Sequence, residues 1–444
     1  MYNVKDYGAV GDGINIDSIG IQKAIDACAE NGGGTVFIPA GTYVCGTMHL
    51  RSHVHILFEK AALVLGSRNL KDFDPLEENP SNNLYQDLSH SYFHHSLFHA
   101  DNVQDIALTG FGRIDMQSEW EVVEDWCRAC KIIAFKECTD VVIRDLNMRN
   151  ATDLAVYLAG CEYVTISGLS MAVHVDGISP DCCKNVTISD CIVDSGDDAI
   201  VPKCSFTLGR FKSMENLTIS NCVVRSSASA IKFGTESNSS FRNITVTGCT
   251  IYDTGLKGIA LQACDGAVIE GISISNISMR NVGNPLLIIV VNRARGPKPE
   301  SLKIGEIKNV NISNVTITGP YPESYQATMA QNAYDYMKEN LTICPNYYPF
   351  IITGQPDSII KNVSLSNVQF VAPGGGTEED RDLEVKLIRN DYPIADLMAD
   401  KFPVYGLYAK HVDNLKLYNV EFMTEKEDKR DDIHLEDVSR YKNL

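Results

Sequence analysis

The sequence predicts an all-β protein that folds as a single-stranded right-handed parallel β-helix with a short N-terminal capping helix. Two observations support this fold class. A pattern in which Asn precedes alternating apolar and polar residues recurs along the chain, and the segments between its copies lack helical periodicity. Corresponding apolar residues lie 22 to 31 positions apart, a spacing typical of one solenoid coil, at Val141, Val164, Val186, Leu217, Ile244 and Ile272.

The copies of the repeat are β-branched, alternate as strands do, and are followed by Gly, Asp or Ser turn residues. The clearest read NVTISDCIV from 185, NLTISNCVV from 216, NITVTGCTI from 243, NVNISNVTI from 309, NVSLSNVQF from 362 and NLKLYNVEF from 414. Parallel coils stack about 4.8 Å apart. Residues that share a slot in successive copies are therefore expected to stand in one column.

A solenoid needs caps on its open ends. Residues 18–30, with Asp17 or Ser18 as N-cap, predict an amphipathic helix that serves as the N-terminal cap. Its apolar face consists of Ile21, Ala24, Ile25 and Cys28.

The rest of the chain is expected to complete one domain over residues 1–444. Residues 32–66 supply the first strands, and residues 423–444 form a charged C-terminal tail. Three interruptions rich in Tyr, Asn, Asp and Pro are too long for turns and predict loops that wall a groove. They span about 67–100, 320–350 and 371–410.

Composition limits the class of protein. With 44% hydrophobic and 22% charged residues, the 444-residue chain can bury a large core and is not mainly disordered. A net charge of −18 argues against sequence-independent binding to nucleic acid or an anionic membrane. No stretch approaches the roughly 18 apolar residues of a membrane span. The chain as given is expected to be cytoplasmic, although a trimmed secreted protein would read the same. Its oligomeric state is not indicated.

Cysteine and histidine clusters do not lead us to expect a metal or other cofactor. Cys191, Cys222 and Cys249 share one slot of the repeat and are expected to be small core residues. Cys127 and Cys130 form a lone CxxC near Cys138, without a fourth zinc ligand. Within residues 88–102, a metal interpretation is open for His90, His94, His95 and His99, and a groove-lining one for His94 or His95.

One column of the repeat carries charge. Counting twelve residues from Val164, Val186 and Leu217 reaches Asp176, Asp198 and Ser229, each followed by a small residue and Ile. Lys257 continues the pattern one position later, and Asp197 stands beside the column. Asp153, twelve residues after Val141, extends it.

Carboxylates this close together repel one another unless cations, hydrogen bonds or protonation relieve them, and such clusters are usually functional. The alternative is that each Asp caps its own turn. Cleavage of a glycosidic bond needs one protonated carboxyl beside the leaving oxygen and a carboxylate that activates water or attacks carbon. The column therefore favours glycoside hydrolysis.

The segment HVDGISPDCCKNVTISDCIVDSGDDAIVPK, residues 174–203, resembles the catalytic stretch of glycoside hydrolase family 28, the polygalacturonase family. VKDYGAVGDG near the start and GFGRIDMQSEW at 110–120 are also similar to that family, and the resemblance covers most of residues 2–300. It implies a right-handed β-helix and hydrolysis with inversion. By resemblance, Asp197 is the general acid, and Asp176 with Asp198 activates the attacking water. Lys203 resembles a lysine that often follows the family's Asp-Asp strand.

The chain departs from the family at three motifs. The family's Gly-His-Gly aligns with residues 228–230, so that Ser229 replaces its histidine, and His174 replaces the Asn of its first motif. Its Arg-Ile-Lys aligns with residues 260–262, which read Ala-Leu-Gln. Both cations that hold a galacturonate carboxylate in the family are therefore missing here.

Other residues are candidates to replace that clamp. Lys232 shares a slot with Ala260 on the next coil, Lys257 ends the column of aspartates, and Glu236 follows on the adjoining loop. The alternatives are a solvated strand face for Lys232 and a surface loop charge for Glu236. His174 either contacts the substrate or Asp198, or replaces the family's Asn structurally. We predict that these residues bind substrate together with Lys203 and Ser229.

The sequence thus predicts a glycoside hydrolase that acts on an oligosaccharide of a pectin-like or related plant or microbial glycan. The resemblance implies inversion, and the long loops are expected to close one end of the groove and enforce exo-action. A β-helical lyase or glycosyl transferase using the same carboxylates is a second hypothesis. A carbohydrate-binding β-helix without catalysis is a third. The expected partner is an oligosaccharide, with no nucleic acid and no membrane.

Overall fold

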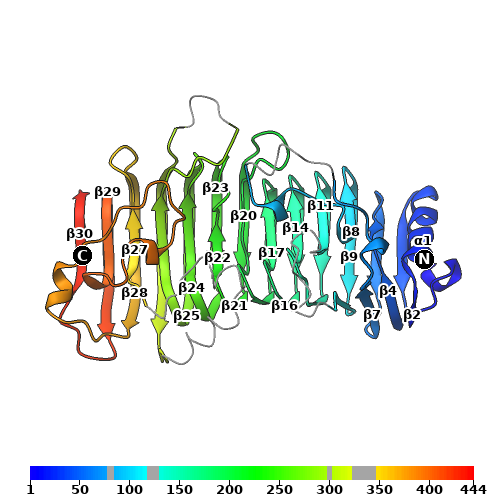
Figure 1. The fold of residues 1–444 in the computed structure, drawn as a ribbon, viewed down its shortest axis with the longest axis horizontal. Helices are drawn as coiled ribbons and strands as arrows, with labels where there is room; N and C mark the ends of the chain where they lie inside the picture. The colour runs from blue at the N-terminus through cyan, green and yellow to red at the C-terminus, as the bar shows by residue number, and fades with distance from the viewer. Residues whose placement is uncertain (78–84, 118–129, 298–302, 323–346) are drawn as a thin grey trace. The chain divides into compact units, whose positions relative to one another are not determined.

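The computed structural model describes residues 1–77, 85–117, 130–297, 303–322 and 347–444 (Figure 1). The chain divides into two compact units, which we describe separately. Unit 1 comprises residues 1–195 and 207–217, and unit 2 comprises residues 196–206 and 218–444.

Unit 1 contains one α-helix, α1 at Ser18–Glu30, and short 3-10 turns at Val4–Tyr7, Leu70–Asp72 and Leu88–His90 among its described residues. Its strands are β1 Tyr2–Asn3, β2 Asp12–Ile16, β3 Gly34–Ile38, β4 Gly41–Cys45, β5 Met48–His49, β6 Val54–Phe58, β7 Ala62–Gly66, β8 Ser96–Asp101, β9 Gln104–Gly110, β10 Arg113–Asp115, β11 Lys131–Lys136, β12 Thr139–Arg144, β13 Asn147–Arg149, β14 Val156–Ala159, β15 Glu162–Ser167, β16 Ser170–Val173, β17 Ile178–Asp181, β18 Lys184–Ser189 and β19 Ile192–Ser195.

The strands of unit 1 pair in parallel, and successive coils lie side by side (Figure 1). One stack runs β5, β8, β11, β14 and β17. Two others contain β9, β12, β15 and β18, and β7, β10, β13, β16 and β19. Val141 pairs with Val164, and Val164 with Val186, so the repeat register predicted from the sequence is confirmed. This is a parallel β-helical arrangement.

The predicted helix forms as α1, with Asp17 at its N-cap position. Ile21, Ala24, Ile25 and Cys28 are each fully buried. The Asp17 side chain accepts hydrogen bonds from the amides of Val10 and Gly11 instead of capping the helix. The apolar spacing in the sequence therefore predicted the buried face correctly.

Unit 2 continues with longer strands. They are β21 Val223–Ser226, β22 Ser229–Phe233, β23 Phe241–Thr247, β24 Thr250–Ala263, β25 Val268–Val290, β26 Glu306–Thr318, β27 Phe350–Thr353, β28 Ile360–Ala372, β29 Val404–Thr424, β30 Asp431–Ser439 and β31 Lys442–Asn443, with 3-10 turns at Glu379–Asp382 and Ala395–Leu397. The chain boundary of the two units falls within β20, Met214–Ser220.

Parallel pairing in unit 2 fixes the register of the functional residues. Ser229 pairs with Lys257, and Lys232 with Ala260, as the sequence predicts. Ile200 forms a parallel bridge with Ile231, which places Asp198 opposite Ser229. The column of the repeat is therefore confirmed within this unit.

Asn residues of the repeat occupy turns with positive φ, a conformation that Asn tolerates better than most residues. Their side-chain amides bond from coil to coil. In unit 2, the Nδ2 of Asn362 donates to Asn309 Oδ1 and the Nδ2 of Asn414 donates to Asn362 Oδ1, each at 2.8 Å. This ladder explains why each copy of the repeat begins with Asn.

Two predicted irregular regions prove partly ordered. Residues 423–444, which the sequence describes as a charged tail, contain β30 and β31, both paired in parallel with β29. Ile433 and Leu435 alternate with polar residues, and Val438 follows a positive-φ residue, Asp437, a pattern that suits a half-covered strand. Residues 373–403 lie between β28 and β29 as the predicted loop. Three predicted features lie wholly or partly outside the described residues. They are most of the loop over 320–350, residues 118–120 of the motif at 110–120, and Cys127.

Two further sequence expectations concern membranes and cysteines. Across the described ranges, no helix is long and apolar enough to cross a membrane. Cys191, Cys222 and Cys249 are buried, as are all cysteines in the described part of the chain, and none of these forms a disulfide.

Candidate active site

The candidate site in unit 2 begins at the turn of residues 196–198, which carries the two adjacent aspartates. Asp198 is 2% exposed, and Asp197 is half-buried. The hydroxyl of Ser226 donates to the carbonyl of Asp197, and the amide of Ala199 donates to the carbonyl of Ser229. Backbone contacts with the next coil therefore hold both carboxyls in place.

The Asp198 carboxylate has two contacts on the next coil. The Lys232 ammonium forms an ion pair with its Oδ2, and the amide of Ser229 donates to its Oδ1 at 3.2 Å. Lys232 is 4% exposed. The interpretation of Lys232 as part of a solvated strand face is therefore wrong.

Burial and charge move the pKa values of the two aspartates in opposite directions. Burial and the charge of Asp198 raise the pKa of Asp197 to about 6, against the opposing effect of Lys232, Lys203 and Lys257. Burial would also raise the pKa of Asp198, but the same three lysines outweigh it and lower that pKa. Below about pH 6, Asp197 thus retains its proton while Asp198 is ionised.

A network of buried charges lies beside this pair. Glu236, which the sequence left open as a surface loop charge, is fully buried. Its carboxylate lies 3.0 Å from the Lys203 ammonium and 3.7 Å from the Arg293 guanidinium. Arg293 also lies 2.9 Å from Asp265. The surface interpretation of Glu236 is therefore wrong, because Lys203 and Arg293 approach it from two other coils.

Those contacts favour a structural role for Lys203 and Glu236 over direct binding of substrate. Each holds the other, and Arg293 ties Glu236 to Asp265. Since Asp198, Glu236 and Asp265 each face a Lys or Arg side chain, their charges are already balanced by protein cations. This donor set suits acid–base chemistry better than a divalent metal.

Lys257 lies two coils beyond Asp198, opposite Ser229 in the register. It is 2% exposed, and its ammonium lies 5.1 Å from the ring centroid of Tyr392. Burial and the charge of Lys232 lower the pKa of Lys257 to about 8. Burial raises the pKa of Tyr392 to about 12, with Asp198 and Asp197 adding to the effect.

Tyr392 was not identified from the sequence. It comes from the loop between β28 and β29, and its pKa responds to the charges of Lys232, Asp198, Asp197 and Glu236. Asp265 was also not identified from the sequence. The one usable signal was the prediction that residues 371–410 wall a groove.

Asp176 and His174 belong to unit 1. Asp176 is 3% exposed, and its carbonyl accepts from the amide of Ala155 at 2.9 Å. The hydroxyl of Ser179 lies 3.5 Å from its Oδ2. The backbone amide of half-buried His174 donates to the carbonyl of Ala151 at 3.1 Å.

Asp153 forms a separate cluster in unit 1. Its Oδ2 lies 2.7 Å from the ammonium of fully buried Lys131 and accepts a hydrogen bond from the Tyr92 hydroxyl. The Lys131 ammonium lies 3.2 Å from the centroid of the Tyr92 ring. Asp153 is therefore paired within a closed cluster.

The histidines of residues 88–102 also lie in unit 1. Burial lowers the pKa of His95, and burial together with His94 lowers that of His99 to about 3. The rings of His94 and His99 pack edge to face, with centroids 4.8 Å apart. Within the described ranges, His90, His94, His95 and His99 form no group whose nitrogens converge on one point.

Comparison with known proteins places these features in context. A model of the family described as glycosyl hydrolases family 28 matches residues 28–343. A probable polygalacturonase from Vitis vinifera is 28% identical over 213 residues, which cover 45% of this chain and 43% of that protein. An exopolygalacturonase from Platanus acerifolia is 24% identical over 72% of this chain and 83% of its own length.

Solved structures show the same fold. The structure of a hyperthermoactive exopolygalacturonase from Thermotoga maritima matches with a TM-score of 0.71 and 16% identity, over 95% of this chain and 91% of that one. The sequence match to the Vitis vinifera protein spans less than half of that protein's length.

Proposed function

This chain belongs to glycosyl hydrolases family 28, whose model matches residues 28–343, and from that premise we propose that it hydrolyses O-glycosidic bonds of a pectin-like oligosaccharide. The opposite pKa shifts of Asp197 and Asp198 carry the proposal. Hydrolysis of a glycoside requires one carboxyl that gives a proton and another that is ionised.

In this proposal Asp197 is the general acid. Its half-buried carboxyl, with a pKa raised to about 6, retains a proton that it can pass to the leaving oxygen. Asp198 is the ionised partner that activates water. We assign the same role, activation of water, to Asp176 because of its position in the repeat. Asp176 lies twelve residues after Val164, just as Asp198 lies twelve residues after Val186. Attack by that water on the face opposite the leaving group gives inversion.

Exo-action is supported by the packing of residues 85–95 in unit 1. The Tyr157 hydroxyl donates to the carbonyl of His90 at 3.0 Å, and the Phe93 ring stacks on Tyr157 at 5.2 Å between centroids. Tyr92 covers Asp153, whose coil neighbours that of Asp176. Since coils are about 4.8 Å apart, this cover leaves room for about one sugar residue on that side of Asp176.

The substrate proposal rests on chemistry and on relatives. Two of the matched proteins carry the name exopolygalacturonase. The charges of Lys232, Lys203 and Lys257 all act on Asp198, and a group of cations at this place suits an acidic sugar. The proposal also retains α1 as the cap of the solenoid end and an oligosaccharide as the partner.

Turnover of trigalacturonate and longer oligogalacturonates tests the proposal. Asp197→Asn and Asp176→Asn are each expected to lower kcat by about 10²–10⁴-fold. Asp190→Asn is the matched control, because Asp190 lies in a positive-φ turn where other repeats carry Asn. Product analysis should give monosaccharide with an inverted anomer.

Three outcomes would overturn it. Near-normal turnover in both Asp197→Asn and Asp176→Asn would remove the assigned acid and base. An unsaturated product that absorbs in the ultraviolet would indicate a lyase. Binding of glycans without turnover of any glycoside would indicate a carbohydrate-binding β-helix.

A further inference from the structure

The buried cations at the candidate site of unit 2 differ in whether a carboxylate already forms an ion pair with them. Lys232 is paired with Asp198, Lys203 with Glu236, and Arg293 with Asp265. Lys257 is the exception. Within the part of the chain that the structure describes, no carboxylate lies at ion-pair distance from its ammonium, whose nearest recorded contact is the ring of Tyr392.

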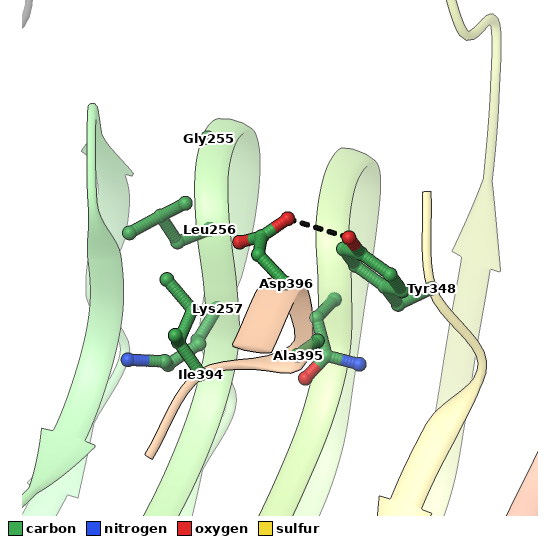
Figure 2. A pocket seen from close by; sticks show the side chains of 8 residues that line it. Gly255, Leu256, Lys257, Tyr348, Ile394, Ala395 and Asp396 are labelled. Carbon is green, nitrogen blue, oxygen red and sulfur yellow. Dashed lines mark hydrogen bonds between the residues drawn. The ribbon is translucent and has the colours of Figure 1, made fainter. Parts of the chain in front are cut away.

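The stem of Lys257 is packed so that its ammonium faces one way. Leu256, Ile394 and Ala395 line a pocket beside it of only ≈ 10 Å³, about the space of one water molecule. Figure 2 shows the Lys257 ammonium directed away from the carboxylate of Asp396, which bonds the Tyr348 hydroxyl instead. The Lys257 ammonium therefore faces the side of the site where Tyr392 lies.

The missing family cations have a structural counterpart. Gln262, which stands at the lost lysine, donates from Nε2 to the carbonyl of Pro393 at 2.9 Å. Ala260, at the lost arginine, packs with Ile388 and Ala395 in one apolar cluster. The positions that lack a cation thus anchor the loop that brings Tyr392 beside Lys257.

We propose that Lys257 and Tyr392 form the subsite that binds the carboxylate of an acidic sugar. The ammonium supplies the charge, and the phenol hydroxyl donates a hydrogen bond from the loop. The inference rests on the proposed function, because it assigns the charged group of that substrate. It also explains how a chain without the family's clamp accepts a uronate.

Burial makes this subsite selective. A carboxylate that reaches Lys257, which is 2% exposed, exchanges water for a poorly solvated cation, where charge pairs are stronger than at the surface. A neutral ester at the same place leaves the ammonium without its counter-charge. Discrimination between acid and ester is therefore expected to exceed tenfold.

The experiment measures binding apart from catalysis. Asp197→Asn protein is titrated calorimetrically with trigalacturonate and with its fully methyl-esterified form at pH 6.5. We expect the acid to bind at least tenfold more tightly. Adding Lys257→Met should reduce that ratio to about one, and adding Tyr392→Phe should reduce it severalfold. The matched control is Lys308→Met, which removes from β26 a half-buried cation that pairs with Glu270 and Glu306, and it should leave the ratio unchanged.

Each failure has its own signature. Equal affinity for acid and ester, or a preference that survives Lys257→Met in protein with an unchanged melting temperature, would overturn this subsite even if hydrolysis is observed. A Lys257-dependent preference in a protein that hydrolyses no glycoside would retain the subsite and reject the proposed function. If Lys257→Met does not fold, Lys257→Gln and the acid-to-ester ratio of Asp197→Asn decide the question.

Discussion

A buried Lys–Asp pair lies among the described residues of each unit, and the two pairs differ in what surrounds them. In unit 1, Lys131 and Asp153 are both fully buried. Tyr92 covers the pair, because its ring packs against the Lys131 ammonium and its hydroxyl donates to the Asp153 carboxylate. In unit 2, the pair of Lys232 and Asp198 has further charges beside it. Asp197, Lys257 and the half-buried ring of Tyr392 adjoin that pair.

The comparison shows how one motif serves two purposes. A pair that is fully buried is out of reach of a ligand, and its main consequence is for folding. An open pair with an additional carboxyl and an additional cation holds groups in protonation states that chemistry can use. The difference lies in the neighbours supplied by the loops, because both pairs join adjacent coils.

The largest expected effect comes from breaking the open pair. Lys232→Met leaves Asp198 buried without its ion-pair partner, which raises the pKa of Asp198 and protonates the proposed base. We expect kcat to fall by about 10²–10⁴-fold. Steady-state kinetics on oligogalacturonate measures this, with Lys232→Arg as the charge-retaining control. A folded Lys232→Met protein with turnover within threefold of wild type would contradict the assignment.

Breaking the closed pair should affect folding instead. Lys131→Met strands the Asp153 carboxylate in a fully buried position, which is expected to cost about 3–5 kcal/mol of unfolding free energy. Chemical denaturation measures the loss. Adding Asp153→Asn should restore part of it by removing the stranded charge. Equal stability of Lys131→Met and wild type would show that the cluster is not structural.

The pH dependence of catalysis sharpens the comparison. Asp197 must be protonated to act as an acid, and burial with the charge of Asp198 raises its pKa to about 6. As the pH rises above that value, the acid loses its proton, so kcat/KM should fall about tenfold per pH unit. The alkaline limb should disappear from the residual activity of Asp197→Asn. A flat profile from pH 5 to pH 8 would exclude Asp197 as the acid.

The smallest effect on unfolding free energy is expected in the Asn ladder, which belongs to neither ion pair and carries no charge. Asn362 has φ 58° and bonds Asn309 and Asn414. Asn362→Ala loses both bonds and strains the turn, at about 1–2 kcal/mol of unfolding free energy. Asn362→Gly relieves the strain and reports the hydrogen bonds alone. A thermal melt of the two variants separates these contributions, and identical midpoints would show that the turn conformation is not strained.

The register of the coils could be predicted from the sequence because each coil repeats a local pattern. Counting from the repeat placed Lys232 opposite Ala260 and Ser229 opposite Lys257, and strand pairing agrees. The same counting could not show that Glu236 is buried. Its burial depends on Lys203 and Arg293, which approach from other coils. The sequence does not show in which direction these two long side chains point.

Local periodicity by itself determined the parallel β-helix and the column that contains Asp198, because period-2 alternation and coil length are properties of neighbouring residues. Only the tertiary structure decided which charged side chains form ion pairs within the protein and which one, Lys257, is proposed to bind a ligand. Tyr392 reaches this site from a loop whose anchor joins Gln262 to Pro393 across 131 positions. No local pattern encodes a contact of that range, since it arises from how the loop packs on the finished coils.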